Sequence, residues 1–120
     1  MTIPKTLDVE RIGTTVIVKP LENVGNLAET ALQAELATIL AQLRGGDSLG
    51  VLVDLERLAY FGTNMLEAMH VIWRPIRAQG GRMFLCNVSD VGREILRVAR
   101  FDVLWPIFDS RSEALESIDA

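Results

Sequence analysis

The chain has 120 residues, of which 49% are hydrophobic, and its 12 basic and 16 acidic side chains give a net charge of −4. A chain of this length fits one domain, residues 1–120, and its apolar content can build a core without a metal or a disulfide. The acidic balance argues against a dedicated nucleic-acid binder, which usually carries a basic stripe.

Targeting and redox signals favour a cytoplasmic protein. The segment before Arg11 has no apolar run typical of a signal peptide. No apolar run approaches the roughly 18 residues that a membrane-spanning helix needs, so we expect no direct membrane insertion. The single Cys86 lies in an apolar run and cannot form an internal disulfide, which predicts a buried thiol in a reducing compartment.

The first third of the chain predicts two strands and a helix. Residues 7–12 and the β-branched segment 14–19 are typical of strands, joined through a glycine. Apolar residues then recur on one helical face over residues 27–43. The expected N-cap and stop of this helix are Asn26 and Gly45-Gly46.

Two further strand-helix pairs follow. The continuous apolar run 49–54 predicts a buried strand, and the spacing over residues 63–78 predicts a helix that Pro75 should kink or shorten. Residues 82–88 predict the next strand, and Ser89 can cap a helix that runs to about Ala99. The residues expected to face inward on the 63–78 helix are Leu66, Met69, Ile72 or Trp73, and Ile76.

The chain closes with a weak strand and a short helix. Residues 104–108 contain Pro106, so they are at best a short edge strand. Ser110 to Glu113 matches a capping box for a last helix that ends near Ile118. Strands that alternate with helices imply an α/β fold with parallel pairs and crossover helices. Receiver-like and thioredoxin-like folds show the same alternation, so it does not indicate a function.

Three fragments of the second half resemble the STAS domain, a family shared by anti-sigma factor antagonists and sulphate transporter tails. They are VLVDLERLAYFGTNML (51–66), IRAQGGRMFLCNVS (76–89) and VGREILRVARFDVLWPIFDSRSEAL (91–115). The resemblance covers residues 49–118 well and residues 14–43 loosely. It implies a STAS-like α/β domain in which a mixed sheet of roughly four or five strands packs against about four helices.

The family's phosphorylation motif, Asp-Ser-Ser-Gly at a strand-helix turn, falls on Gly62 to Met65. Thr63 takes the place of the phosphoacceptor Ser, while Gly62, Asn64 and Met65 replace the Asp, the second Ser and the Gly. Because Thr serves as the acceptor in some relatives, the resemblance makes Thr63 the phosphorylation candidate. The missing Asp and Gly argue against recognition by a standard partner kinase.

The residues themselves leave three roles open for Thr63. Its hydroxyl could cap the following helix by accepting from a free amide, a role that Asn64 could also fill. It could instead be a phosphoacceptor, or it could contact a partner without modification. Glu67 is placed to complement the positive end of the helix.

The resemblance implies a non-enzymatic module that binds a kinase-like anti-sigma factor and is released by phosphorylation. The alternative is an accessory subunit of a membrane transport system or of a stress-signalling complex, without a phosphoswitch. The sequence has no catalytic carboxylate pair, Gly-rich phosphate loop or Ser-His-Asp set, so we expect no enzyme, no cofactor and no nucleic-acid partner. The expected partner-binding residues are Glu22, Asn23, Gly62, Thr63, Asn64, Met65 and Glu67.

The remaining polar and aromatic residues favour ordinary structural roles. His70 has no second His or paired Cys with which to bind a metal, so a half-exposed surface histidine is expected. Trp73 and Trp105 are expected in the core, although Trp105 beside Pro106 could be partly exposed and anchor a partner. The residues expected on one solvated face of the third helix, or alternatively in a small basic patch for an acidic partner, are Arg93, Arg97 and Arg100.

Overall fold

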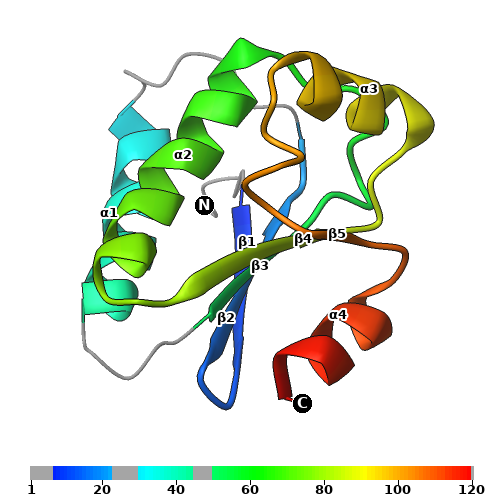
Figure 1. The fold of residues 1–120 in the computed structure, drawn as a ribbon. Coiled ribbons are helices and arrows are strands. Elements are labelled where there is room, and N and C mark those ends of the chain that lie inside the picture. Colours follow the sequence, from blue (N-terminus) through cyan, green and yellow to red (C-terminus); the bar gives the residue numbers. More distant parts are fainter. Residues whose placement is uncertain (1–6, 23–29, 45–49, 120) are drawn as a thin grey trace.

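The computed structural model describes residues 7–22, 30–44 and 50–119. Five strands form one mixed sheet in the order β1-β2-β3-β4-β5, with β1 antiparallel to β2 and all other neighbours parallel (Figure 1). The predicted α/β fold with a mixed sheet is therefore confirmed. The elements are β1 (Leu7–Ile12), β2 (Thr15–Pro20), α1 (Thr30–Arg44), β3 (Gly50–Asp54), α2 (Thr63–Ala78), β4 (Arg82–Cys86), α3 (Asp90–Val98), β5 (Ile107–Phe108) and α4 (Arg111–Asp119).

The helices divide between the two faces of the sheet. Val51 and Val53 of β3 join a buried cluster with α1, α2 and α3, whereas Leu52 between them packs with Ala114 of α4. This alternation follows from the two-residue period of a strand. Figure 1 shows α1 and α2 on one side of the sheet and α4 on the other. One long side of α2 therefore faces the core, and its opposite side is exposed.

Most predicted boundaries agree with the structure. The helix predicted over residues 63–78 is α2, and it continues through Pro75 without the expected shortening. The Ser89 hydroxyl caps α3 by accepting from the Gly92 amide at 2.9 Å. The Glu113 amide likewise donates to the Ser110 hydroxyl at 3.1 Å, as the capping box predicts. The hairpin between β1 and β2 turns at Gly13, whose φ of 60° favours glycine.

The end of β4 differs from the prediction, whereas the end of α3 agrees with it within one residue. Strand β4 ends at Cys86 rather than at residue 88, because Asn87 adopts a left-handed φ of 56°. Helix α3 ends at Val98, and Arg100 takes φ 63°. The Phe101 amide donates back to the Leu96 carbonyl at 2.9 Å, which closes the helix in a Schellman motif. Arg100 therefore does not share the helical face predicted for it.

The burial of α2 agrees with the prediction except at Leu66, which is only partly buried, and at Ala68, which is buried without having been predicted. Of the alternatives Ile72 and Trp73, Ile72 is the buried one, and Trp73 packs partly buried against the core. Trp105 has an exposed fraction of 0%, so the expected core position is confirmed and the alternative of partial exposure is wrong. The physical reason is that the loop after α3 folds back and stacks Phe101 on Trp105 at 4.8 Å. The positions predicted at Asn23, Asn26 and Gly45-Gly46 lie outside the described residues.

Candidate functional site

The predicted phosphorylation site lies in the first turn of α2, and Gly62 is the N-cap of this helix. The Gly62 carbonyl accepts from the amides of Met65 at 3.1 Å and Leu66 at 3.3 Å. Within the described chain, no side chain caps this helix start. Thr63 is therefore the first helical residue, and the prediction that Thr63 or Asn64 caps α2 is wrong. The reason is that the cap position falls one residue earlier, where glycine has no side chain to accept from the free amides.

The four motif positions have different environments. Met65 is 1% exposed and packs into the core, so the bulky side chain in the first turn anchors the helix. Thr63 and Asn64 are exposed on the outer side of the turn, as is Glu67 one turn later. A Cβ added at Gly62 would meet nothing within 4 Å, so packing does not exclude the family's Asp at this position. Glu22 is also exposed and follows β2, at the sheet edge from which the chain leaves β3 for α2.

The loop between β3 and α2 is held from both sides. The buried side chain of Phe61 fixes it in the core next to α3, where a Cβ on Gly92 would lie 3.0 Å from the Phe61 ring. The Ser89 hydroxyl donates to the Ala59 carbonyl at 2.7 Å while it caps α3. One hydroxyl thus joins the start of α3 to the loop that presents Thr63.

We expect Ser89→Ala to lower the free energy of unfolding by about 1.5–3 kcal/mol, because it removes a helix cap and an additional hydrogen bond. The matched control is Ser110→Ala, since the Ser110 hydroxyl caps α4 but has no such bond across the structure among the described contacts. That variant should cost only about 0.5–2 kcal/mol. Urea unfolding of both proteins measures the difference, and equal losses would show that the Ala59 bond contributes nothing.

A buried carboxylate organises the carboxyl edge of the sheet. Asp54 ends β3 and is 2% exposed. One of its oxygens accepts from the Glu56 amide at 3.1 Å and from Asn87 Nδ2 at 3.0 Å. The other accepts from Arg111 Nε at 3.1 Å and Nη2 at 3.0 Å, and Arg111 also pairs with Glu10 of β1.

The hydrogen bonds around Asp54 determine its charge state. Burial by itself would raise its pKa, but the bonds from Asn87, the Glu56 amide and the Arg111 guanidinium together hold the pKa below its ordinary value. Asp54 is therefore an ionised structural anchor between β3, the residue after β4 and the start of α4. Sequence reasoning missed this role, although a charged residue that ends a wholly apolar strand is a recognisable signal.

Cys86 is a buried thiol, as predicted, with an exposed fraction of 0%. Burial, aided by the negative charge of Asp54, raises its pKa to about 12. The thiolate is the reactive form of cysteine, so this side chain is chemically inert at neutral pH.

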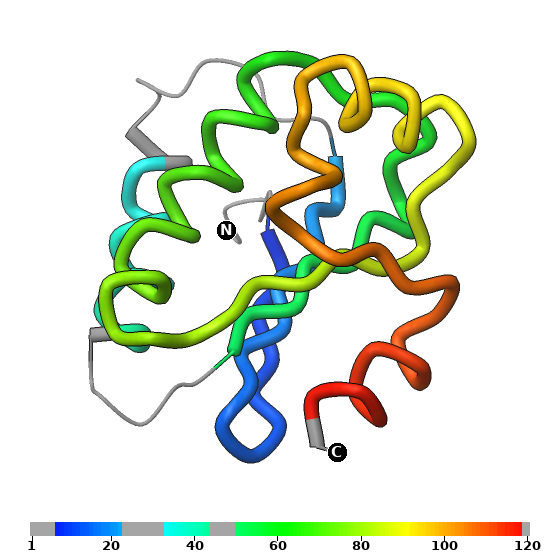
Figure 2. Tube along the Cα trace, viewed as in Figure 1, coloured from blue at the N-terminus to red at the C-terminus, as the bar shows by residue number. Residues whose placement is uncertain are grey.

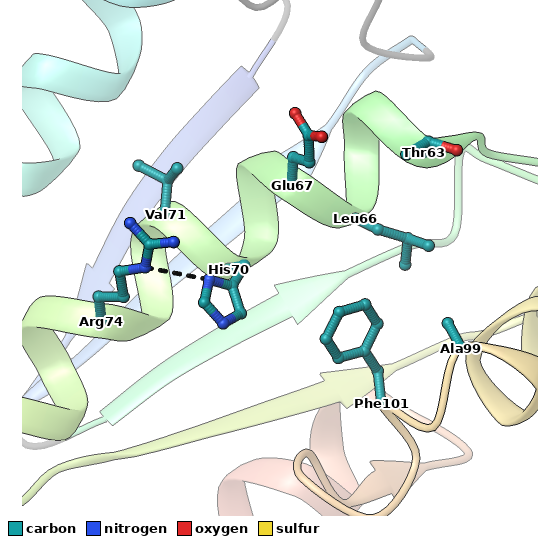
Figure 3. A pocket seen from close by; sticks show the side chains of 8 residues that line it. All are labelled: Thr63, Leu66, Glu67, His70, Val71, Arg74, Ala99 and Phe101. Atoms are coloured by element: carbon teal, nitrogen blue, oxygen red, sulfur yellow. Dashed lines mark hydrogen bonds between the residues drawn. The ribbon is translucent and has the colours of Figure 1, made fainter.

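A groove of about 590 Å³ begins at Thr63 and follows the outer side of α2 (Figure 3). His70 lies in it, half exposed as predicted, and its Nδ1 accepts from Arg74 Nε at 3.1 Å. The His70 ring also lies 6.2 Å from the ring of Phe101, which forms the facing wall. The lining residues are Thr63, Leu66, Glu67, His70, Val71 and Arg74 from α2, with Ala99 and Phe101 opposite.

The predicted basic face of the third helix does not form a free patch. Arg93 pairs with Asp109 at 2.9 Å, and Arg97 pairs with Glu94. Among the residues that the structure describes, no cluster of three or more His, Cys, Asp or Glu side chains could hold a metal ion. Over the same residues, every helix is too short or too polar to span a membrane.

Comparison with known proteins decides the family. The family model of the STAS domain matches residues 7–114. This chain belongs to the STAS domain family. The resemblance noted in the sequence is therefore confirmed, and the turn at Gly62 to Met65 remains the predicted position of the family's motif.

Individual relatives agree with this assignment. The STAS chain is 32% identical over 95 residues, 78% of either protein, to the "Putative anti-sigma factor antagonist BtrV" of Bordetella bronchiseptica. It is 26% identical to an anti-sigma-factor antagonist (STAS) domain protein from Planctomyces limnophilus, with a TM-score of 0.76 over 95% of this chain and 98% of that one.

A more distant likeness supports the fold alone. The phosphorylated form of the Bacillus cell fate determinant SpoIIAA is 18% identical, with a TM-score of 0.72 over 93% of this chain and 98% of that one. The STAS chain therefore has the fold of anti-sigma factor antagonists.

Proposed function

We propose that this STAS domain is a cytoplasmic anti-sigma factor antagonist that binds a kinase-like anti-sigma factor through the first turn of α2, and that phosphorylation of Thr63 releases the partner. The observation that carries the proposal is the position of Thr63. Its side chain is exposed, it is the first residue of the helix, and Gly62 rather than Thr63 occupies the cap position. The contact surface includes Asn64, Glu67 and the exposed Glu22, while Met65 supports the turn from inside. Asn23, also predicted to bind the partner, lies outside the described residues.

Phosphate chemistry suits this position. A phosphate would add roughly −1.5 to −2 charges at neutral pH. The first amides of a helix lack intrahelical acceptors and favour an anion, so the fold can tolerate the modification. The added charge would then act on a docked partner rather than on the stability of the domain. The relatives support this direction, since one is named as an anti-sigma factor antagonist and another was solved in a phosphorylated form.

We expect Thr63→Asp to weaken binding of the anti-sigma factor at least about tenfold, or ~1.4 kcal/mol, and to leave the melting temperature within a few degrees. The matched control is Ser112→Asp, which places the same charge at an exposed position in the first turn of α4, on the opposite face of the sheet. The measurement is affinity purification from cell lysate with wild type and both variants as baits, followed by mass spectrometry and titration of the recovered partner.

Incubation of the recovered partner with ATP tests the switch directly. A phosphate should appear on Thr63 in wild type and in the Ser112→Asp variant, Thr63→Ser should still accept it, and Thr63→Ala should not. If Thr63→Asp binds the partner as tightly as wild type does, there is no phosphoswitch. That outcome would favour the alternative role as a subunit of a membrane transport system or a stress-signalling complex. The absence of the motif's Asp and Gly also supports this alternative.

A further inference from the structure

Three arginines near the C-terminal end of α2 make no ion pair with any carboxylate in the described part of the chain. Arg74 donates to His70, and the guanidinium of Arg77 lies 5.0 Å from the ring centroid of Trp73. Arg82 is exposed at the start of β4. By contrast, the arginines of α3 and α4 pair with Asp109, Glu94 and Asp54. The positive charges at this end of α2 are therefore available to bind an acidic ligand, although the whole chain has a net charge of −4.

Two of these arginines line a second groove, of about 360 Å³. Arg77 and Arg82 form its charged side, and Leu104 and Pro106 form its apolar side. Leu104 is 42% exposed, and its neighbour Val103 is 80% exposed. A groove with two guanidinium groups and an apolar wall suits a ligand that carries both carboxylates and an apolar side chain.

The second groove continues the first one along the helix. Trp73 lines the second groove, and its ring lies 5.3 Å from that of His70 in the first groove. The segment 99–106 supplies the facing wall of both grooves, and Figure 2 shows it running beside α2. We call this surface the α2 band. It consists of Leu66, His70, Trp73, Arg77, Phe101 and Leu104, with Arg82 at its cationic end.

We propose that the α2 band receives an acidic segment of a protein partner, with an apolar side chain of the partner against His70 and Phe101 and its carboxylates on Arg77 and Arg82. From Leu66 to Arg77 the helix rises about 16 Å, which corresponds to about eleven residues of a docked helix or five of an extended strand. A nucleic acid would need a longer basic stripe and few apolar walls. The inference rests on the proposed function only in that the partner is a protein, and it does not require phosphorylation of Thr63.

Synthetic peptides of defined charge and polarity test the inference directly. One twelve-residue peptide alternates Glu and Asp with Leu and Phe. A second has the same apolar residues with Lys at every acidic position, and a third has the acidic residues with Ser at every apolar position. Each is titrated into the ¹⁵N-labelled full chain at low and at raised salt, and the shifts of backbone amide and arginine Nε signals are followed.

The acidic apolar peptide should shift signals of residues 66–77, 82 and 99–106 and bind at least about tenfold more tightly than the other two, and added salt should weaken it. Arg77→Glu with Arg82→Glu should abolish this preference. Arg11→Glu is the matched control, because Arg11 is an exposed arginine of β1 that pairs with no described carboxylate and lines neither groove. Arg82→Glu alone, which leaves the sequence of α2 unchanged, should weaken the same preference and keeps the test valid if the double variant misfolds.

Several outcomes would overturn the inference. These are equal binding of the acidic and lysine peptides, shifts confined to other surfaces, no binding of the acidic peptide at millimolar concentration, or equal loss in the Arg11→Glu control. If the serine-containing peptide binds as tightly as the apolar one, the apolar walls of the grooves do not contribute to binding. A single-stranded oligonucleotide that binds the band more tightly than the acidic peptide would identify a different class of ligand. The peptide titrations use the chain with an unmodified Thr63 and the readout is the charge preference at Arg77 and Arg82, so failure here and failure of the phosphoswitch are distinguishable.

Discussion

Trp105→Ala is expected to lower the free energy of unfolding by about 3–5 kcal/mol, the range for removing a large aromatic side chain from a core. Trp105 is fully buried and stacks on Phe101 at 4.8 Å, and its ring meets Trp73 edge-on at 6.0 Å. Its removal takes away the support of both walls of the α2 band. Urea unfolding followed by circular dichroism measures the loss.

Trp105→Phe is the matched control for this prediction. The Trp105 indole nitrogen is buried and has no hydrogen-bond partner among the described residues, so phenylalanine sacrifices no such bond. Because the aromatic contact survives, the cost should stay near 1–2 kcal/mol, in the range for small losses of core volume. If Trp105→Ala and Trp105→Phe lower the free energy of unfolding by similar amounts, the aromatic stacking does not stabilise this region.

Asp54→Asn should lower the free energy of unfolding by about 2–4 kcal/mol at neutral pH, because it removes the charge that pairs with Arg111 in a buried site. The asparagine side chain keeps the shape of the carboxylate but replaces one oxygen with a donor. The Arg111 side chain is 31% exposed, so solvent relieves part of the cost of its unpaired charge. Glu10→Gln, which removes the exposed second partner of Arg111, should cost at most about 1 kcal/mol.

The cost of Asp54→Asn should depend on pH in a defined direction. The native pKa of Asp54 lies below its ordinary value of 3.8, because its hydrogen bonds and Arg111 favour the charged form. Its contribution to stability is therefore complete above the unfolded-state pKa and is lost as the pH falls through the native value. The difference between wild type and variant should be constant from pH 7 to about pH 5 and shrink below about pH 4. A difference that grows on acidification would contradict the ionised state.

The places where sequence reasoning was wrong share one cause. The helix over residues 63–78 was predicted to its last residue, because a long apolar period and flanking glycines are local signals. The cap of the same helix is Gly62 rather than Thr63 or Asn64, the two candidates that the sequence offered, because a polar side chain at a helix start is a good local candidate whether or not it is used. Trp105 was expected in the core, but only the loop that folds back through the Schellman motif at Arg100 excludes the partial exposure that the sequence left open.

The sequence by itself determined the order of strands and helices, the family, and the place of the candidate switch at Thr63. These follow from residue periodicity, from glycine and serine boundaries, and from fragments in a fixed order along the chain. Only the tertiary structure decided that Met65 points inward while Thr63 points out, that Asp54 meets Arg111 across 57 positions of sequence, and that Phe101 faces His70 to form a groove. The physical reason is that burial and ion pairing depend on which distant segments share a space, and a local pattern does not contain that information.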